Sequence, residues 1–151
     1  DITAAVKAVT RFPLLVKLSP NAQDIVAVAQ AVEAAGACGV SLVNTFLGMA
    51  VDIQAKKPVF DNVYAGLSGP AIRPIALRMV HQVARAVRIP VVGMGGHPKD
   101  ALAFLMAGAR AVQVGIATFR DPWAMPNIVR GLEAYCREEN LSNIQEICGI
   151  L

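Results

Sequence analysis

The sequence predicts an α/β fold with parallel strands, and three observations lead to this prediction. Hydrophobic residues make up 55% of the 151-residue chain and charged residues only 17%, which suits one well-buried globular unit. A strand–helix–strand unit occurs twice, and such units have parallel strands joined by a right-handed crossover. Two apolar runs, Val91–Met94 and Val112–Val114, each lead into glycine and are typical of buried strands.

The first unit begins with a strand at Phe12–Leu18, which a turn connects to a helix at Ile25–Ala35. Gly36 ends this helix, because the left-handed conformation at a helix C-terminus favours glycine. A strand at Cys38–Val43 completes the unit.

The second unit has the same order. A strand at Ile89–Met94 and a turn at His97–Asp100 precede a helix at Ala101–Ala107, which Gly108 ends. The strand at Arg110–Val114 follows. Repetition of such units favours either a barrel or a doubly wound sheet.

The remaining segments are a long excursion and three helices. Phe46–Pro70 carries several glycines and prolines, and a loop of this length in a compact domain is usually functional. We expect helices at Ile72–Val87 and Asn127–Glu138 and a short final helix at Ser142–Leu151. With no linker in view, residues 1–151 are expected to belong to one domain.

Chain length and the glycines together indicate part of a larger phosphate-binding barrel. A complete (β/α)8 barrel needs about 250 residues, so we expect this chain to be the C-terminal piece of a longer protein. Gly95-Gly96 and Gly115 follow the last two strands, where phosphate groups bind in such barrels. Their uncovered backbone N–H groups predict a cradle for an anion.

Composition argues against several classes of partner. The net charge of +3 comes from scattered basic residues, which does not favour nucleic acid, and no apolar run reaches the roughly 18 residues of a membrane span. Cys38, Cys136 and Cys148 form an odd set without metal spacing. They predict reduced thiols in the cytoplasm and no metal site.

Lys17 is the sharpest candidate for a ligand contact. It ends an apolar strand, where a lysine is costly unless an anion or dipole pairs with it. The alternative is a lysine that extends from the barrel mouth into solvent. Asn44 and Thr45 end the next strand, where substrate-binding groups of barrels lie, although both residue types are also common in turns.

Other polar residues have weaker claims. Ser68-Gly69 would bring backbone near a planar ligand or form an ordinary turn, and His97 would contact a phosphate or remain solvated. Cys38 precedes its strand and is rejected as a nucleophile. Asp24 and Asp100 open helices, where a carboxylate complements the helix dipole, so both are interpreted as structural.

Five segments resemble class 1 dihydroorotate dehydrogenase, in order and over nearly the whole chain. The run from Leu47 to Pro58 is most similar to the 1B, NAD-linked branch. The five segments are Val16–Asn21, Leu42–Thr45, Gly48–Ala50, Gly66–Ile72 and Gly93–Gly96.

This resemblance implies an FMN-containing (β/α)8 barrel that oxidises dihydroorotate to orotate in pyrimidine biosynthesis. It implies a homo-oligomer and an electron-transfer subunit with an iron–sulfur cluster and FAD. Asn44 and Thr45 would bind the substrate. The residues implied to contact FMN are Lys17 at the pyrimidine ring, Val43 and Gly69 against the flavin, and Gly95, Gly96, Gly115 and Ile116 at the phosphate end.

Three features depart from the family pattern. The family's catalytic cysteine lies upstream of the strand that contains Lys17, so it is outside this chain and the fragment alone is expected to be inactive. Ile116 stands where the family usually has threonine, and the loop Gly96–Asp100 is about two residues short.

The alternatives to this family are another phosphate-binding barrel enzyme, such as an isomerase or synthase, and a non-catalytic half-barrel module.

Overall fold

Four parallel strands form the sheet at the centre of the computed structural model, which describes residues 1–151. The strands follow one another across the sheet in chain order, β1-β2-β7-β8. The predicted α/β class with about four parallel strands is therefore confirmed. The strands are β1 (Leu15–Lys17), β2 (Gly39–Leu42), β7 (Val91–Met94) and β8 (Ala111–Gln113).

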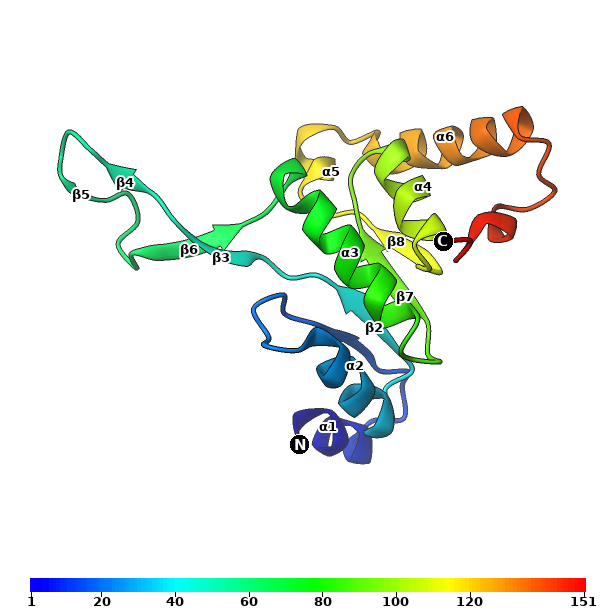
Figure 1. Ribbon diagram of the computed structural model, residues 1–151, viewed down its shortest axis with the longest axis horizontal. Helices are drawn as coiled ribbons and strands as arrows, with labels where there is room; N and C mark the ends of the chain where they lie inside the picture. The colour runs from blue at the N-terminus through cyan, green and yellow to red at the C-terminus, as the bar shows by residue number, and fades with distance from the viewer.

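Three helices connect these strands and pack on one face of the sheet (Figure 1). They are α2 (Ile25–Ala34), α3 (Arg73–Ala84) and α4 (Pro98–Met106). The buried core lies between these helices and the sheet and includes Val40, Leu42, Val80 and Phe104. Burial of such side chains contributes the main favourable free energy of folding.

The opposite face of the sheet carries a different row of side chains. Gly93 faces the helices, because a Cβ built there would lie 2.8 Å from Phe104 of α4. Alternate strand residues point to opposite faces, so Val92 points away from the helices. Lys17 pairs in register with Ser41, and Ser41 with Val92, which places all three on the face without helices.

The excursion between β2 and α3 is an antiparallel arm rather than an irregular loop. The strand β3 (Phe46–Met49) pairs with β6 (Tyr64–Leu67), and β4 (Val51–Asp52) pairs with β5 (Lys57–Pro58). The arm projects away from the sheet and helices (Figure 1). The expectation of a loop was therefore wrong. The strands of the arm are too short, and too often interrupted by turns, to give a clear pattern in the sequence.

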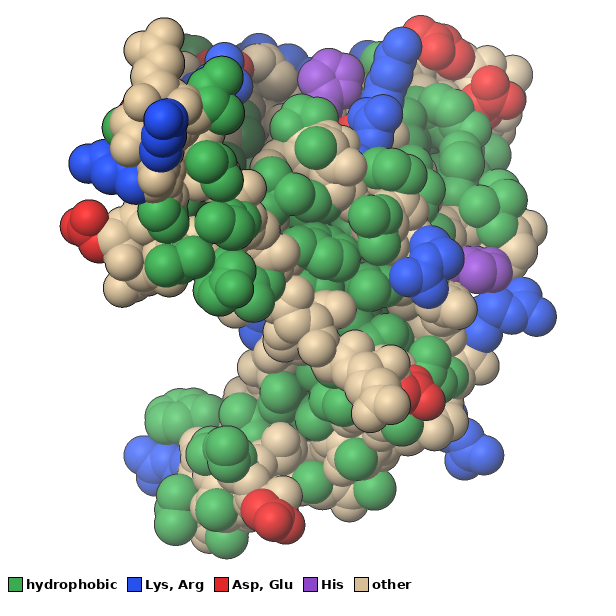
Figure 2. Space-filling model, turned by 60° about the vertical axis from the view of Figure 1, so that its left-hand side comes forward, with side chains coloured by type: hydrophobic (Ala, Val, Ile, Leu, Met, Phe, Trp, Pro, Cys, Tyr) green, Lys and Arg blue, Asp and Glu red, His purple; other side chains and the backbone are tan.

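Many apolar side chains of the chain are exposed, and Figure 2 shows them crowded over one face of the molecule. On the arm they include Leu47, Ile53, Phe60 and Tyr64, with Ile53 83% exposed. Contiguous apolar surface of this kind is typical of a surface that packs against further protein.

Several boundaries differ from the predicted ones for local reasons. The strand β1 begins at Leu15, because Pro13 before it has no N–H for the ladder. The strand β7 begins at Val91, because Pro90 supplies only its carbonyl, which accepts from the Val40 amide at 3.0 Å. The other two strands each lose one residue at both ends, which is within normal variation.

The predicted turn at His97–Asp100 is wrong, since α4 already begins at Pro98. Proline fits the first turn of a helix, where its missing N–H has no partner to lose. Likewise α6 (Ala124–Glu138) begins before the expected Asn127, and the final helix is limited to the 3-10 turn Ile144–Ile147.

Three elements were not expected from the sequence. The helix α1 (Ile2–Val9) precedes β1, the 3-10 turn Pro70–Ile72 leads into α3, and the short helix α5 (Ala117–Arg120) follows β8. The helix predicted to reach Val87 ends at Ala84. None of the helices has both the length and the apolar content needed to cross a bilayer.

Candidate functional site

The C-terminal ends of the four parallel strands meet at one edge of the sheet. The register pairs Lys17 with Ser41, Leu42 with Gly93, and Met94 with Gln113. The hydrogen-bond ladder continues past the strands. The Leu18 amide donates to Ser41 O at 2.8 Å, the Asn44 amide to Leu18 O at 3.0 Å, and the Gly95 amide to Gln113 O at 3.1 Å.

This continuation brings predicted site residues from different segments together. Asn44 is hydrogen-bonded to the residue directly after Lys17, so the two predicted contacts lie at neighbouring strand ends. The Gly95 amide is likewise bonded to Gln113 at the end of β8, and Gln113 lies two residues before Gly115.

Lys17 opens onto a hollow of about 700 Å³ beside β8 and α6. Met94, Gln113 and Gly115 line the same hollow, so two predicted cofactor contacts share one space. The Lys17 side chain is exposed and forms no ion pair, since the chain's one salt bridge joins Arg73 and Asp100. Its ammonium group is therefore free to approach an anionic or polarised ligand.

Asn44 and Thr45 are both exposed at the root of the arm. The Asn44 Oδ1 accepts from the Thr45 amide at 2.8 Å, which leaves the two N–H donors of the Asn44 side chain free. The Thr45 side chain fills the space beside Gly66, where a Cβ would lie 2.5 Å from Thr45 Oγ1. Gly66 is thus required for Thr45 to take this position.

The glycines predicted to cradle a phosphate divide into two kinds. A Cβ at Gly95 would lie 2.9 Å from Asp100 Cβ, and one at Gly96 would lie 2.7 Å from Ala117 Cβ. Both glycines are therefore required by close packing within the chain. Gly115 has no atom within 4 Å of such a Cβ.

The remaining predicted contacts have varied surroundings. Val43 is 7% exposed and belongs to the hydrophobic core. Ile116 is 69% exposed just before α5. Gly69 has a φ of +94° with open space around its Cβ position, so the turn at this end of the arm requires glycine through its backbone conformation.

Polar residues beside the site have structural roles. His97 caps α4, because its Nδ1 accepts from the Lys99 amide at 3.2 Å. Asp100 accepts from Arg73 at 2.6 Å and joins the starts of α4 and α3. Asp24 caps α2 by accepting from two backbone amides, at 2.9 and 3.0 Å. The structural interpretation of both aspartates is confirmed.

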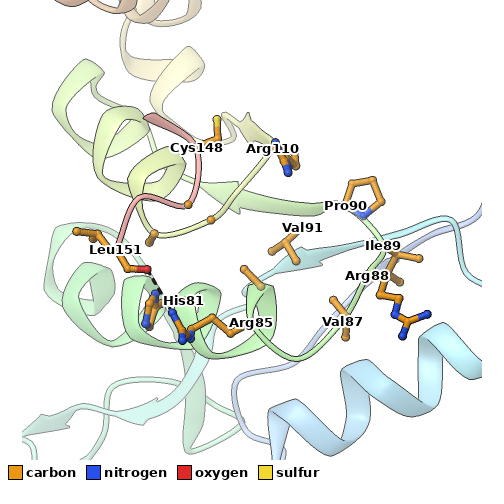
Figure 3. A pocket seen from close by; sticks show the side chains of 14 residues that line it. His81, Arg85, Val87, Arg88, Ile89, Pro90, Val91, Arg110, Cys148 and Leu151 are labelled. Atoms are coloured by element: carbon orange, nitrogen blue, oxygen red, sulfur yellow. Dashed lines mark hydrogen bonds between the residues drawn. The ribbon is translucent and has the colours of Figure 1, made fainter. Parts of the chain in front are cut away.

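A second cavity of about 290 Å³ lies at the opposite end of the sheet, beside the start of β7 (Figure 3). Arg85 Nη1 donates to Leu151 O at 3.4 Å, and Arg110 Nη1 donates to Gln145 Oε1 at 3.4 Å. Burial raises the pKa of the Cys148 thiol, although the charge of Arg110 opposes this shift. Two of the arginines that line this cavity are therefore hydrogen-bonded within the chain.

Cys38 also lies at the N-terminal end of the parallel strands, as the second cavity does. It directly precedes β2, and its amide donates to Leu14 O at 2.8 Å. The thiol is therefore at the N-terminal end of the strands, as the sequence predicts, and away from Lys17 and Asn44.

Sequence reasoning missed one polar residue of this region. Asn21, in the loop after β1, donates from Nδ2 to Thr45 O at 3.1 Å and accepts at Oδ1 from the Leu47 amide at 3.0 Å. Its position inside a segment that resembles the known family was a signal for its importance. That signal did not reveal its partners, which are 24 and 26 residues away.

Comparisons with known proteins identify the family of the chain. The model of the dihydroorotate dehydrogenase family matches residues 1–136. The catalytic subunit of dihydroorotate dehydrogenase B (NAD(+)) from Alkaliphilus oremlandii is 53% identical over 153 aligned positions, covering 100% of this chain and 51% of that protein. The corresponding subunit from Desulforamulus reducens is 51% identical, covering 99% of this chain and 50% of that protein.

A similar subunit from Petrotoga mobilis is 50% identical and covers 100% of this chain and 51% of that protein. The chain thus spans about half the length of the curated relatives it matches. Because the family model matches most of the chain, and identities near 50% extend over all of it, the chain belongs to the dihydroorotate dehydrogenase family.

Proposed function

We propose that residues 1–151 are the C-terminal half of an FMN-dependent dihydroorotate dehydrogenase, which oxidises dihydroorotate to orotate in pyrimidine biosynthesis. The observation that carries this proposal is the shared edge of the sheet. There Lys17 and Asn44 end neighbouring strands, and Lys17 and Gly115 line one hollow. The family to which the chain belongs supplies the identity of the reaction.

The proposed architecture is one half of a single (β/α)8 barrel domain. Four parallel strands in chain order, with their connecting helices on one face, are the arrangement of such a half. A doubly wound sheet would reverse the strand order and place helices on both faces. The relatives' double length leaves room for four further strands.

The residues present fit FMN at this edge. Gly115 leaves open space for a ligand group to approach its backbone, and Lys17 supplies an unpaired cation in the same hollow. Gly69 has no neighbour within 4 Å of its Cβ position, which suits contact with a flat ring. The proposed FMN contacts are Lys17, Val43, Gly69, Gly95, Gly96, Gly115 and Ile116.

When bound, FMN supplies the electron acceptor for the oxidation. The chain's own residues bind and orient. The compact Lys17 ammonium places positive charge at the cofactor side, in a site where electrostatic interactions are stronger than in water. The free N–H donors of Asn44 are suited to a ring carbonyl oxygen of the substrate, and the Thr45 hydroxyl to its carboxylate.

The rest of the catalytic machinery is proposed to lie outside these residues. The cysteine base that removes a substrate proton belongs to the other half of the barrel. The protein would be cytoplasmic and homo-oligomeric, and electrons would pass to NAD through a subunit with an iron–sulfur cluster and FAD. The relatives are named as catalytic subunits of an NAD(+) enzyme, which supports NAD as the electron acceptor and a separate partner subunit.

The experiment compares the complete protein with residues 1–151 alone, both purified under the same conditions. The complete protein is expected to show a flavin absorption spectrum, to bind orotate and to form orotate from dihydroorotate. The 151-residue chain is expected to be inactive, because general base catalysis typically contributes 10²–10⁴-fold and its base is missing. A colourless complete protein that binds no orotate would refute the proposal, and full turnover by the short chain would refute the division of roles.

A further inference from the structure

We propose that Asn21 is a positioning residue for the substrate contacts Asn44 and Thr45. This inference rests on the proposed function. Asn21 lies in the loop between β1 and α2, whereas Asn44 and Thr45 lie at the end of β2, so the amide joins two separate loops at the same edge of the sheet.

Asn21 uses both ends of its side-chain amide on the root of the arm. Nδ2 donates to Thr45 O at 3.1 Å, and Oδ1 accepts from the Leu47 amide at 3.0 Å. The side chain therefore replaces the partner strand that this stretch of backbone lacks on that side. Two hydrogen bonds to one planar group fix both position and orientation, which one bond does not.

The loop that carries Asn21 is itself held at Ser19. Ser19 Oγ accepts from the Asn21 amide at 3.3 Å and, more weakly, from Asn21 Nδ2 at 3.5 Å. Since the loop begins directly after Lys17 and Leu18, Asn21 connects the backbone beside the proposed cofactor contact with that of the proposed substrate contacts.

The side chain of Thr45 packs against Gly66 of the arm. Gly66 of β6 has no side chain, and Thr45 fills that space, with its Oγ1 2.5 Å from where a Cβ would be. Asn21 therefore holds the backbone of Thr45, and Gly66 accommodates its side chain. The substrate-binding turn is preorganised by two residues that do not need to touch the substrate, and preorganisation lowers the cost of binding.

The test uses the complete flavin-loaded protein and three variants. Asn21→Ala removes both bonds, and Asn21→Asp keeps the acceptor for the Leu47 amide but loses the donor to Thr45 O. Asn62→Ala is the matched control, because Asn62 lies in the same arm and its side chain makes no hydrogen bond within the chain.

Three quantities are measured: hydrogen exchange of the Leu47 amide, the dissociation constant of orotate from the flavin absorbance change, and FMN content. Asn21→Ala is expected to speed exchange at Leu47 and to weaken orotate binding by about 3- to 10-fold, the scale of one or two partly exposed hydrogen bonds. FMN content should stay unchanged. Asn21→Asp should protect Leu47 more than Asn21→Ala does, and Asn62→Ala should match wild type.

Each other outcome would overturn a particular part of the proposal. Unchanged hydrogen exchange at Leu47 in Asn21→Ala would show that Asn21 does not hold the backbone at the root of the arm, which overturns the proposal. Faster exchange with unchanged orotate affinity overturns the positioning role and leaves the proposed function intact. Loss of FMN in parallel with orotate affinity shows a general structural role instead. A wild-type protein that binds no orotate refutes the proposed function, while the exchange measurement still decides whether Asn21 holds the arm.

Discussion

Replacing Gly108 by alanine should destabilise the protein more than the same change at Gly36, although both glycines end helices of the repeated unit. Gly36 has a φ of +90° and Gly108 a φ of +110°, so alanine is strained at both, by about 1–2 kcal/mol. At Gly36 the nearest atom to a new Cβ is the flexible Lys7 Cγ at 3.2 Å. At Gly108 it is Ala84 Cβ at 2.6 Å, on a helix that cannot rotate away.

The clash at Gly108 adds an overpacking cost of about 1–3 kcal/mol, so the expected totals are about 1–2 kcal/mol for Gly36→Ala and about 2–5 kcal/mol for Gly108→Ala. The assay is urea unfolding of the complete protein followed by circular dichroism. Adding Ala84→Gly to the Gly108 variant removes the clash but not the backbone strain, so alanine at Gly108 should cost less in that background. Equal losses at the two glycines, or no coupling to Ala84, would refute the packing argument.

Two further predictions concern the site and the open sheet. Lys17→Ala in the complete protein should lower FMN occupancy or make its midpoint potential more negative by about 30 mV, a tenfold effect for a two-electron couple, because a nearby positive charge is lost. Lys57→Ala in β5 of the arm is the control. Lys17→Arg should restore function only in part, because a planar guanidinium needs more space than an ammonium group. Unchanged FMN occupancy and midpoint potential in Lys17→Ala would show that Lys17 is a surface lysine. The isolated 151-residue chain should associate, because the edges of β1 and β8 are unpaired and its apolar surface is exposed. Light scattering that shows a stable monomer over a wide concentration range would contradict this.

The sequence predicted the four strands and the helices between them because each depends on local signals. Gly36 and Gly108 were expected to end helices and do so with positive φ. The exact bounds of the strands and helices differ from the predicted ones at single prolines, such as Pro13 before β1 and Pro98 at the start of α4. The arm was missed because its pairing joins residues far apart in the chain, and short strands give little periodicity.

The position of Lys17 and Asn44 at the same end of the sheet was predictable, but the contacts around them were not. Parallel strands bring their C-terminal ends to one edge, so Lys17 and Asn44 were correctly expected to be neighbours. The two hydrogen bonds of the Asn21 side chain, and the space that Gly66 leaves for Thr45, depend on where the arm returns to the sheet. No pattern within one element encodes that return.

The glycines near the proposed phosphate site show how such ambiguity is resolved. In the sequence, Gly95, Gly96 and Gly115 carry the same signal, since a glycine after an apolar run serves either a close ligand or a close neighbour in the chain. Asp100 and Ala117 already occupy the space beside Gly95 and Gly96, so these two glycines are explained without any ligand. Gly115 has no such neighbour and lines the same hollow as Lys17. The physical case for a phosphate group at this edge therefore depends on the backbone at Gly115 more than on the glycine pair that first suggested it.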